Sequence, residues 1–453
     1  MESLKTDYLI IGNSAAGVTA AEQIRAHAPE ARIVIVSDEP YAVYGRPLIS
    51  YLVEGKTDEE HIGFKPEGFY EEQRLDALLG PDYRVVRLDA AAHQALLANG
   101  TAIDYGKCLL ATGSVPFVPP IAGLDGCSRV FTFLTLDDAK GAWGATVEAT
   151  EAAHKAGRRS RVVVIGGGLI GLKAAEALSH HADEVLVLEL APHILPAVLD
   201  EQGAAILQER LAEDGIRCMP GISMEKLRCA ASPDPMEAVL TNGEVVTADV
   251  VVAAVGVRPN SALAVEAGAE QGRGLICDET MRTTLPDVYA AGDVVQVRDL
   301  LDGAQRPLAL WPNAMRQGRM AGLHMVGAAD AEPFEGSFAV NAVDFFDASL
   351  LTAGLINPPD GAGCAQEVIV GAGSYAKFVT RDDRLVGYIL LNRPANAGIY
   401  TSLIEQKTPL STLEGPIFEE APINLDFPQE ARWERLHRRY PRNRDERGWK
   451  ERG

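Results

Sequence analysis

The stretch RVVVIGGGLIGLKAAEALSHHADEVLVLELAP, residues 161–192, joins two short apolar runs through a glycine-rich turn and a helical segment. A strand, a turn, a helix and a strand within about thirty residues make a βαβ unit. Gly166, Gly168 and Gly171 stand where such a turn needs a tight corner, an open approach for a pyrophosphate, and close contact between helix and strand. We predict strands at 161–165 and 185–188, with a dinucleotide site in the turn after the first strand.

Glu189 ends the second of these strands, about twenty residues past the turn. A carboxylate at this place accepts a hydrogen bond from the ribose 2′-OH of NAD and repels the 2′-phosphate of NADP. Residues 190–192 contain no arginine, and His193 is the only nearby side chain that can carry a positive charge. We therefore expect a preference for NADH over NADPH.

An earlier stretch, DYLIIGNSAAGVTAAEQIRAHAPEARIVIVSDEP at residues 7–40, repeats the pattern with a serine in the middle of the turn. Ser14 lies between Gly12 and Gly17. Serine is small enough for a phosphate to approach the backbone, and its hydroxyl can donate a hydrogen bond. Taken alone, this stretch also fits a strand–helix corner that binds nothing.

Two acidic residues, Asp38 and Glu39, follow the strand that we expect at residues 32–36. Their carboxylates can accept hydrogen bonds from ribose hydroxyls, as in other units of this type. Two dinucleotide sites in one chain imply two cofactors. The natural pair is a resident flavin and an exchanging nicotinamide.

The whole chain is acidic, with a net charge of −21 over 453 residues, which argues against nucleic-acid binding by its body. Residues 431–453 differ, because nine Arg and Lys face four Asp and Glu there, a net of +5 that leaves −26 for the rest. We find no apolar run of about eighteen residues, so we expect no membrane span. The N-terminal residues lack the features of a signal peptide, which favours a cytoplasmic location.

Six cysteines are scattered along the chain: Cys108, Cys127, Cys218, Cys229, Cys277 and Cys364. They form no CxxC pair and no cluster with histidines that would suggest zinc or an iron–sulfur centre. We therefore expect reduced, mostly packed thiols and no metal site.

Four further stretches carry a family resemblance: KCLLATGSVPFVPPIAGLDG (107–126), ADVVVAAVGVRPN (248–260), DETMRTTLPDVYAAGDV (278–294) and LWPNAMRQGRMAG (310–322). With the two turns, they resemble the two-dinucleotide-fold flavoprotein family. The resemblance implies an α/β fold with two Rossmann-like dinucleotide-binding domains, for FAD and NAD, and a small α+β C-terminal interface domain. The domains expected from it are 1–115 with 257–326 for FAD, 116–256 for NAD, 327–427 for the interface domain, and 428–453 as a basic tail.

The same resemblance assigns cofactor contacts. It places Thr112 and Gly113 against the FAD, and it gives Asp293 a ribitol hydroxyl to bind, which suits a carboxylate acceptor. The helix that starts near Ala314 would point backbone N–H groups at the flavin pyrimidine edge, where its dipole stabilises negative charge. Further expected contacts are Ala15, Ala16, Val86, Ala111, Leu169, Ile170, Gly256, Gly292 and Pro312.

The stretch YAVYGRPLISYLVEG at residues 41–55 indicates the branch of the family. Relatives that use a thiol relay carry cysteine where this chain has Tyr44, and the first 107 residues contain no cysteine. The string YGRPLIS resembles rubredoxin and ferredoxin reductases and NADH-dependent nitrite reductases. That resemblance places Arg46 on the pyrophosphate and Pro47 by the flavin ring, and it implies an iron–sulfur partner that takes electrons singly.

One pair of positions departs from many relatives, which carry a lysine and a glutamate that meet near flavin N5. Here the two positions hold Tyr51 and Lys173. Our hypothesis is that Lys173 alone supplies the positive charge beside the ring. At ~4 Å and an effective dielectric constant near 20, one unit charge contributes about 4 kcal/mol before desolvation. The alternative is a solvated lysine on a helix.

Residues 334–405 read as strands, with a hairpin across Asp382–Asp383 and a helix that starts within 395–407. This part resembles the family's interface domain, and we expect a structural role. In the tail, Trp433, Tyr440 and Trp449 lie among arginines, and Pro441 breaks any helix. The tail is either a solvated, disordered end or an arm that docks on another subunit.

We predict an FAD-dependent NAD(H) oxidoreductase that exchanges electrons with an iron–sulfur protein or subunit. Flavin subunits of anaerobic 2-oxoacid:acceptor dehydrogenases, the phenylglyoxylate enzyme among them, fit this description and pass electrons to NAD. Two alternatives stay open. One is a stand-alone NADH oxidase or rubredoxin reductase, and the other is a redox-gated interaction module like apoptosis-inducing factor.

Overall fold

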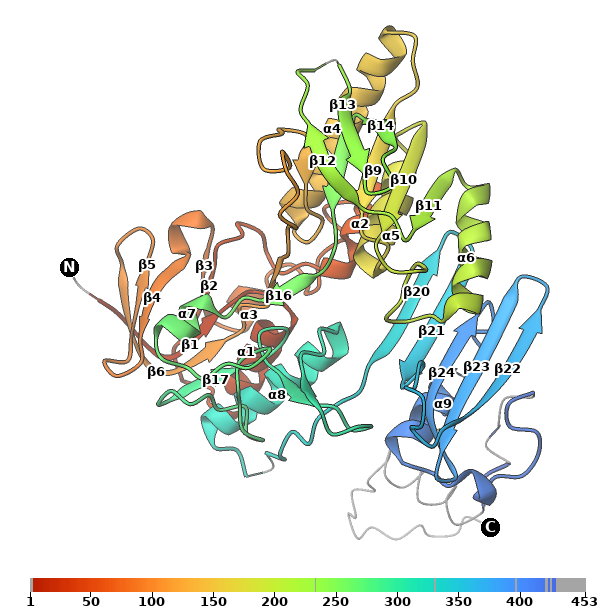
Figure 1. Cartoon of the computed structure of the whole chain (residues 1–453). Helices are drawn as coiled ribbons and strands as arrows, with labels where there is room; N and C mark the ends of the chain where they lie inside the picture. Colours follow the sequence, from red (N-terminus) through yellow and green to blue (C-terminus); the bar gives the residue numbers. More distant parts are fainter. Residues whose placement is uncertain are drawn as a thin grey trace, which may run out of the picture. The chain divides into compact units, whose positions relative to one another are not determined.

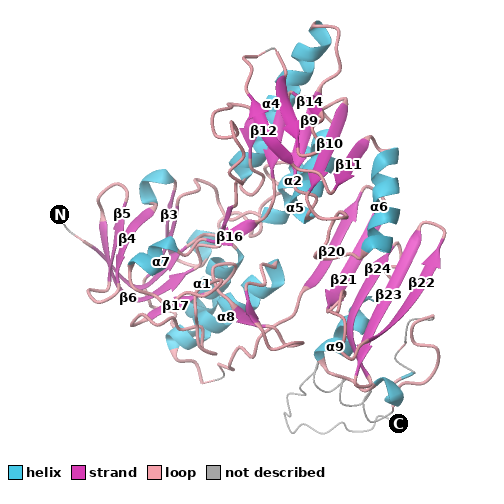
Figure 2. Cartoon of the chain, viewed as in Figure 1, coloured by secondary structure: helices cyan, strands magenta, loops and turns pink. Residues whose placement is uncertain are grey.

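The computed structural model describes residues 3–232, 234–329, 331–395, 397–419, 423 and 426–428. The expectations for the basic tail at residues 431–453 lie outside these residues. The chain forms two compact units, Met1–Ala348 and Ser349–Gly453. The first unit contains two parallel sheets and the second an antiparallel sheet (Figures 1 and 2).

The first sheet is built around two buried strands, β1 (Leu4–Ile11) and β6 (Ala102–Leu110), which pair in parallel along their length. Its parallel part has the order β3-β2-β1-β6-β17, and its antiparallel part adds β5 and β4 beyond the start of β6. The other bounds are β2 (Ile33–Ser37), β3 (Leu75–Leu79), β4 (Val85–Asp89), β5 (Gln94–Leu97) and β17 (Val288–Ala290). Strand β17 therefore returns to this sheet from far along the chain.

Two helices, α1 (Ala15–His27) and α8 (Trp311–Val326), pack closely against each other on this sheet. Glycines make the approach possible. A Cβ on Gly318 would lie 2.2 Å from the carbonyl oxygen of Ala16, and one on Gly322 would lie 2.7 Å from that of Ala20. The close packing ties the C-terminal part of the first unit to its first helix.

The second sheet is fully parallel, with the order β11-β10-β9-β15-β8. The central strands β10, β9 and β15 are apolar and buried between their ends, as expected for strands that are covered on both faces. Its bounds are β8 (Val130–Phe131), β9 (Arg161–Ile165), β10 (Glu184–Glu189), β11 (Ile216–Pro220) and β15 (Val250–Ala253), with helices α4 (Leu136–Lys155), α5 (Leu169–Ser179) and α6 (Glu201–Glu213). Three antiparallel strands lie beside it: β12 (Met224–Arg228), β13 (Met236–Leu240) and β14 (Val245–Ala248).

The chain passes from the first sheet to the second and back through β7 (Ser114–Pro116) and β16 (Val257–Pro259), which pair with each other. The Arg258 guanidinium carbon lies 4.0 Å from the centroid of the Phe117 ring beside this pair. The remaining elements of the first unit are η1 (Arg46–Leu48), α2 (Ile49–Val53), α3 (Phe69–Glu72), η2 (Pro81–Tyr83), α7 (Ala262–Glu266), β18 (Val297–Arg298), β19 (Gln305–Arg306) and β20 (Val340–Phe345).

The second unit is an antiparallel sheet in which β21, β24, β23 and β22 are neighbours in that order. Its elements are β21 (Ala348–Gly354), β22 (Ala365–Gly371), β23 (Ser374–Arg381), β24 (Arg384–Leu391), α9 (Ala397–Glu405) and η3 (Leu410–Thr412). The predicted hairpin across Asp382 and Asp383 is confirmed. Both turn residues have positive φ, 50° and 58°, as a two-residue turn between strands requires.

The predicted fold class is confirmed, because the two parallel sheets and the antiparallel C-terminal sheet are all present. The compact units divide at residues 348 and 349, whereas we expected an interface domain from residue 327. The finer domain bounds stay a prediction. Among the residues that the structure describes, no helix is long and apolar enough to cross a membrane.

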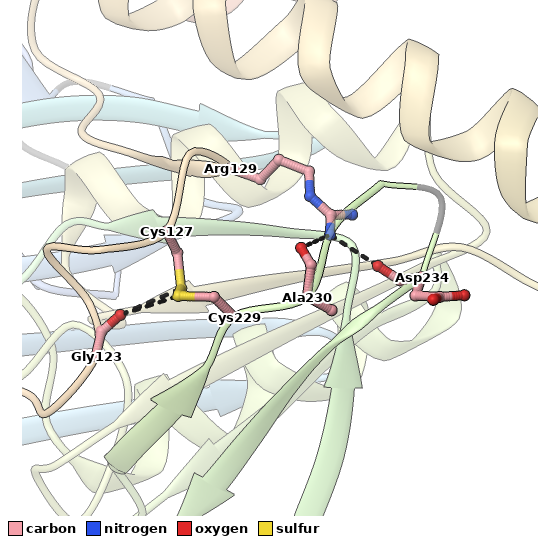
Figure 3. The surroundings of a disulfide bond; sticks show 6 residues. All are labelled: Gly123, Cys127, Arg129, Cys229, Ala230 and Asp234. Atoms are coloured by element: carbon pink, nitrogen blue, oxygen red, sulfur yellow. Dashed lines mark hydrogen bonds between the residues drawn. A yellow bond between two sulfur atoms is a disulfide. The ribbon is translucent and has the colours of Figure 1, made fainter.

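The expectation of reduced thiols is wrong for two cysteines. Cys127 and Cys229 form a disulfide with a Cα–Cα distance of 5.3 Å (Figure 3). The backbone brings them together, since Leu227 donates from its N–H to the carbonyl oxygen of Ala122 beside the bond. Arg129 then donates to the carbonyl oxygens of Ala230 and Asp234, at 3.0 and 2.8 Å. Neither cysteine belongs to the first 107 residues, where a thiol relay was excluded.

Candidate functional site

The first glycine turn lies at the carboxyl end of β1. Gly12 has φ +123°, and a Cβ there would lie 2.1 Å from the carbonyl oxygen of Ala111, at the end of β6. A Cβ on Gly17 would lie 2.1 Å from the carbonyl oxygen of Gly12. Ser14 caps α1, but its side chain makes no capping hydrogen bond. The flanking glycines are therefore needed for packing, and the serine hydroxyl is left for another role.

Two more segments meet this turn. Ala291, which follows β17, donates to the carbonyl oxygen of Leu110. The next residue, Gly292, donates from its N–H to Gln317 Oε1 of α8 at 2.7 Å. A Cβ on Gly292 would lie 3.3 Å from Ala16 Cβ and 3.7 Å from Ala314 Cβ. Residues far apart in the sequence thus meet at the carboxyl ends of parallel strands, where open α/β sheets bind ligands.

Asp293 follows in this turn, where Ser114 Oγ donates to its Oδ2 at 3.0 Å. Burial raises the pKa of Asp293, while the Ser114 bond and the Arg46 charge act in the opposite direction. A buried carboxylate with one partner keeps acceptor capacity for a hydroxyl group.

The two acidic residues after β2 have different surroundings, and their contact with ribose hydroxyls stays a prediction. Asp38 is exposed, whereas Glu39 accepts from Tyr44 Oη at 2.6 Å and pairs with Arg46 at 2.5 Å. Arg46 also donates to the carbonyl oxygen of Leu134 at 3.0 Å. Its guanidinium is therefore held by protein groups beside the turn, and Glu39 is the residue that orients it.

The second glycine turn repeats the first at the carboxyl end of β9. A Cβ on Gly166, which has φ +108°, would lie 2.4 Å from the carbonyl oxygen of Ala254, and one on Gly171 would lie 1.9 Å from that of Gly166. A Cβ on Gly168 would meet nothing within 4 Å. The outer glycines are needed by the fold, and the middle one leaves backbone open at the start of α5.

Glu189 ends β10 beside this turn. Its Oε2 accepts from the N–H of Gly167 at 2.6 Å, and its Oε1 accepts from the N–H of Ala191 at 2.7 Å. The carboxylate is therefore fixed at the turn before any ligand arrives. Leu190, the next residue, is 74% exposed.

Lys173 is not a solvated lysine, because its side chain is only 14% exposed. Its ammonium donates to Glu176, and it lies 3.3 Å from Glu54 Oε1 and 5.0 Å from the centroid of the Tyr51 ring. Lys56 lies 5.4 Å from the same centroid. Two lysines and two carboxylates therefore gather here, and the expectation that Lys173 supplies the positive charge beside the flavin ring stays a prediction.

The other predicted positions are distributed as follows. Ala15 and Ala16 are buried in the first turn of α1, and Pro312 and Ala314 lie in the first turn of α8. Leu169 and Ile170 begin α5, next to the second turn. Thr112 donates to the carbonyl oxygen of Asn260 at 2.7 Å, and Gly113 and Gly256 have positive φ with open space around a Cβ. Pro47 is exposed in η1.

Val86 is not brought to the first turn. It lies on β4 and is 38% exposed, and β4 is joined to the turn-bearing strand β1 only through β5 and β6. Its assigned contact with a cofactor stays a prediction.

The sequence interpretation missed several residues that shape the site. Asn13 donates to the carbonyl oxygen of Tyr41 and accepts from Tyr70, and these bonds hold the loop after β2. Glu54 and Glu176 were also missed. The spacing of Glu176 three residues after Lys173 on a helix is a readable signal for contact. The contact between Lys173 and Glu54 could not be predicted from the sequence, because Glu54 lies at the end of α2 and Lys173 lies on α5.

The residues present fit two dinucleotides. Each turn has outer glycines that the fold requires and a middle position that is open or has an unused hydroxyl, at the N-terminus of a helix. Backbone N–H groups at such an end bind phosphate.

A family model described as "Pyridine nucleotide-disulphide oxidoreductase" matches residues 6–318. The chain belongs to this family. This pyridine nucleotide-disulphide oxidoreductase is 30% identical over 409 residues, 90% of its length and 93% of the relative's, to the NADH-dependent phenylglyoxylate dehydrogenase subunit epsilon of Aromatoleum evansii. It is 34% identical over 326 residues, 70% of each chain, to an NADH oxidase of Methanocaldococcus jannaschii.

The oxidoreductase also resembles a solved structure, the ferredoxin reductase for the CYP199A2 system from Rhodopseudomonas palustris. The TM-score is 0.77 at 28% identity, covering 89% of this chain and 95% of that chain. The family membership makes the protein an enzyme of the oxidoreductase class.

Proposed function

We propose that this enzyme binds FAD at the first turn and NAD(H) at the second, and exchanges electrons with an iron–sulfur protein or subunit. The observation that carries the proposal is the pair of turns with open middle positions in one chain. The likeness to a ferredoxin reductase over most of the chain supports the kind of electron partner.

The roles of the residues follow from their surroundings. The start of α1 with Ser14 would hold the FAD pyrophosphate, Arg46 would balance its charge, and Asp293 would accept from a ribitol hydroxyl. The start of α8 would face the flavin ring with its dipole. Bound FAD would supply the conversion between a two-electron hydride and single electrons.

On the nicotinamide side, the start of α5 would hold the pyrophosphate and Glu189 the ribose hydroxyls. Hydride transfer itself needs no acid or base from the protein. The task of the chain is to bring the two rings together and to set the charge around them. Tyr51 lies on α2, which follows Arg46 in the chain, and Lys173 lies on α5, which begins after Gly168. The two helices pack against each other.

The finer proposal is an electron-transfer subunit that reduces NAD+ within a larger dehydrogenase. Its support is the coverage of nearly the whole epsilon subunit by this chain. In this proposal the organic substrate binds to other chains, and the potential of the partner sets the direction. We also propose a cytoplasmic location.

The test begins with protein reconstituted with FAD in the absence of air. NADH should bleach the flavin absorbance, and a ferredoxin should then restore it much faster than oxygen does. Rapid NADH consumption in air without any added carrier would instead favour an NADH oxidase, the function of the relative from Methanocaldococcus jannaschii.

Native purification distinguishes the larger complex from a free reductase. We expect chains that carry iron–sulfur absorbance to travel with the protein. Purification as a single chain that reduces a ferredoxin would contradict the subunit role and keep the reductase. A chain that binds no flavin after reconstitution would overturn the whole proposal.

A further inference from the structure

Four charged side chains gather where α2 packs against α5, and we call them the α2–α5 charge cluster: Glu54, Lys56, Lys173 and Glu176. The side chains of Glu54 and Glu176 are 0% and 1% exposed, and that of Lys173 is 14% exposed. Lys56 is 49% exposed and forms the outer edge of the cluster. Charged side chains are seldom buried to this extent unless they are paired.

Each carboxylate of the cluster has both ammonium groups within 4 Å. Glu54 lies 3.3 Å from Lys173 Nζ and 2.5 Å from Lys56 Nζ. Glu176 accepts from Lys173, lies 3.8 Å from Lys56 Nζ, and accepts from the N–H of Phe346 at 2.7 Å. Two carboxylates and two ammonium groups therefore share one site with a net charge of zero.

The contacts of Glu176 hold the Lys173 side chain in one place. The Lys173 ammonium also donates to the carbonyl oxygen of Asp344 at 3.3 Å and lies 5.8 Å from the centroid of the Phe345 ring. Strand β20 supplies these groups, and Glu176 accepts from the N–H of Phe346, the residue that follows this strand. The ammonium is thus fixed beside the Tyr51 ring by three elements.

We propose that Glu54 and Glu176 are positioning residues that hold the Lys173 ammonium beside Tyr51 and cancel the charge of the cluster, and that this balance sets the reduction potential of the flavin. The proposal rests on the proposed function, in which the flavin binds next to this part of the molecule. Reduction adds negative charge to a flavin, so a nearby positive charge favours the reduced form and a nearby negative charge opposes it.

The proposal predicts signs. Glu176→Gln leaves the cluster at +1 and should favour the reduced flavin, whereas Lys173→Met leaves it at −1 and should disfavour it. The double variant Lys173→Met/Glu176→Gln returns the cluster to zero. We expect each single variant to change the equilibrium constant for two-electron reduction at least tenfold, which is about 30 mV in midpoint potential. The double variant should lie nearer to the wild type than either.

The measurement is the midpoint potential of the FAD-loaded chain, with the melting temperature of each variant as a check on folding. The matched control is Glu213→Gln, because Arg210 and Glu213 form a pair with the same i,i+3 spacing on α6 and Glu213 is 73% exposed. This variant should leave the potential unchanged. If Lys173→Met does not fold, Lys56→Met replaces it, because it also removes one positive charge from the cluster. It should lower the midpoint potential of the flavin.

The outcomes separate the two proposals. Flavin that binds with the same potential in all the cluster variants would overturn the inference and leave the proposed function intact. Single variants that shift the potential in the same direction would also overturn it, because opposite charges must act oppositely. A chain that binds no flavin would overturn the proposed function and this inference with it.

Discussion

Glu189 shows how much a single residue can be prepared for its ligand. Both carboxylate oxygens are already held by backbone N–H groups, those of Gly167 and Ala191. In the proposed function, a carboxylate fixed in this way would lose little freedom on accepting a ribose hydroxyl, and its negative charge would lie where NADPH carries a phosphate.

We expect Glu189→Ala to lower kcat/KM for NADH roughly 10- to 100-fold, since hydrogen bonds to a charged group contribute about 1.5–3 kcal/mol. The preference over NADPH should shrink, because the repulsion is lost. Steady-state kinetics with both nucleotides measure the effect. Glu184→Ala on the same strand is the control, since Glu184 pairs with Arg161 instead. Wild-type enzyme that uses both nucleotides equally would contradict the assignment.

The Asp293 carboxyl is a single group that makes the stability of the chain depend on pH. Its pKa is raised above the ordinary value of 3.8, chiefly by burial. Because the folded state then holds the proton more tightly than the unfolded state, this contribution to stability is full below 3.8 and is lost as the pH rises through the folded pKa.

The FAD-free chain with Asp293→Asn should therefore be at least as stable as the wild type at neutral pH, while its affinity for FAD should fall. Melting temperatures between about pH 4 and pH 7, together with FAD titrations, test both parts. An FAD-free variant that melts well below the wild type at pH 7, or one that binds FAD equally well, would contradict the role given to Asp293.

At the scale of elements, the second glycine turn contains two kinds of glycine. Gly171 lies where helix α5 touches the strand before it, and a Cβ there would lie 1.9 Å from a carbonyl oxygen. Gly168 has φ −79° and ψ −178°, which other residues adopt readily, and no atom lies within 4 Å of an added Cβ. The fold needs the first glycine, whereas in the proposed function only the ligand would need the second.

Gly171→Ala should destabilise the chain by about 1–3 kcal/mol, as overpacking does in a tight core. Gly168→Ala should leave the melting temperature within about a degree of the wild type, since surface changes without new contacts have small effects, and should weaken NAD binding at least tenfold. Thermal melts and NAD titrations of both variants provide the comparison. Equal effects of the two substitutions on stability would contradict the claim that the fold needs Gly171 but not Gly168.

At the scale of the whole molecule, the Cys127–Cys229 bond joins residues 102 positions apart. A cross-link over so long a loop restricts the unfolded chain, and natural disulfides typically contribute about 2–4 kcal/mol. It also ties the segment before β8 to the end of β12, two parts of the chain that pair through a β-bridge between Ala122 and Lys226.

We expect Cys127→Ser/Cys229→Ser, or treatment with a dithiol reductant, to lower the melting temperature of the first unit by several degrees. Cys364→Ser is the control, because Cys364 is a free cysteine of the second unit. Thiol counting on the denatured wild-type protein should find four free thiols. Six free thiols in protein alkylated at the moment of cell lysis would show that the bond is absent in the cell.

Both βαβ units were open to prediction because their signals are local. The glycines, the apolar strands and the terminal acid stand within about thirty residues, and strand β9 begins and ends where the sequence predicts. Strand β1 begins at Leu4, before the stretch at residues 7–40 that carries the pattern, because its first residues pair with β6, about a hundred positions away. Such pairing leaves little trace in the local pattern.

By itself, the sequence determined the two glycine turns, the acid at the second one, the lack of a cysteine beside Arg46, and the α/β class. These depend on backbone conformations and spacings that neighbouring residues impose on one another. Only the tertiary structure decided that Glu39 holds Arg46, that Cys127 meets Cys229, and that Lys173 lies between two carboxylates. The physical reason is that such partners come from separate elements, and packing, not spacing along the chain, sets the distance between their charges.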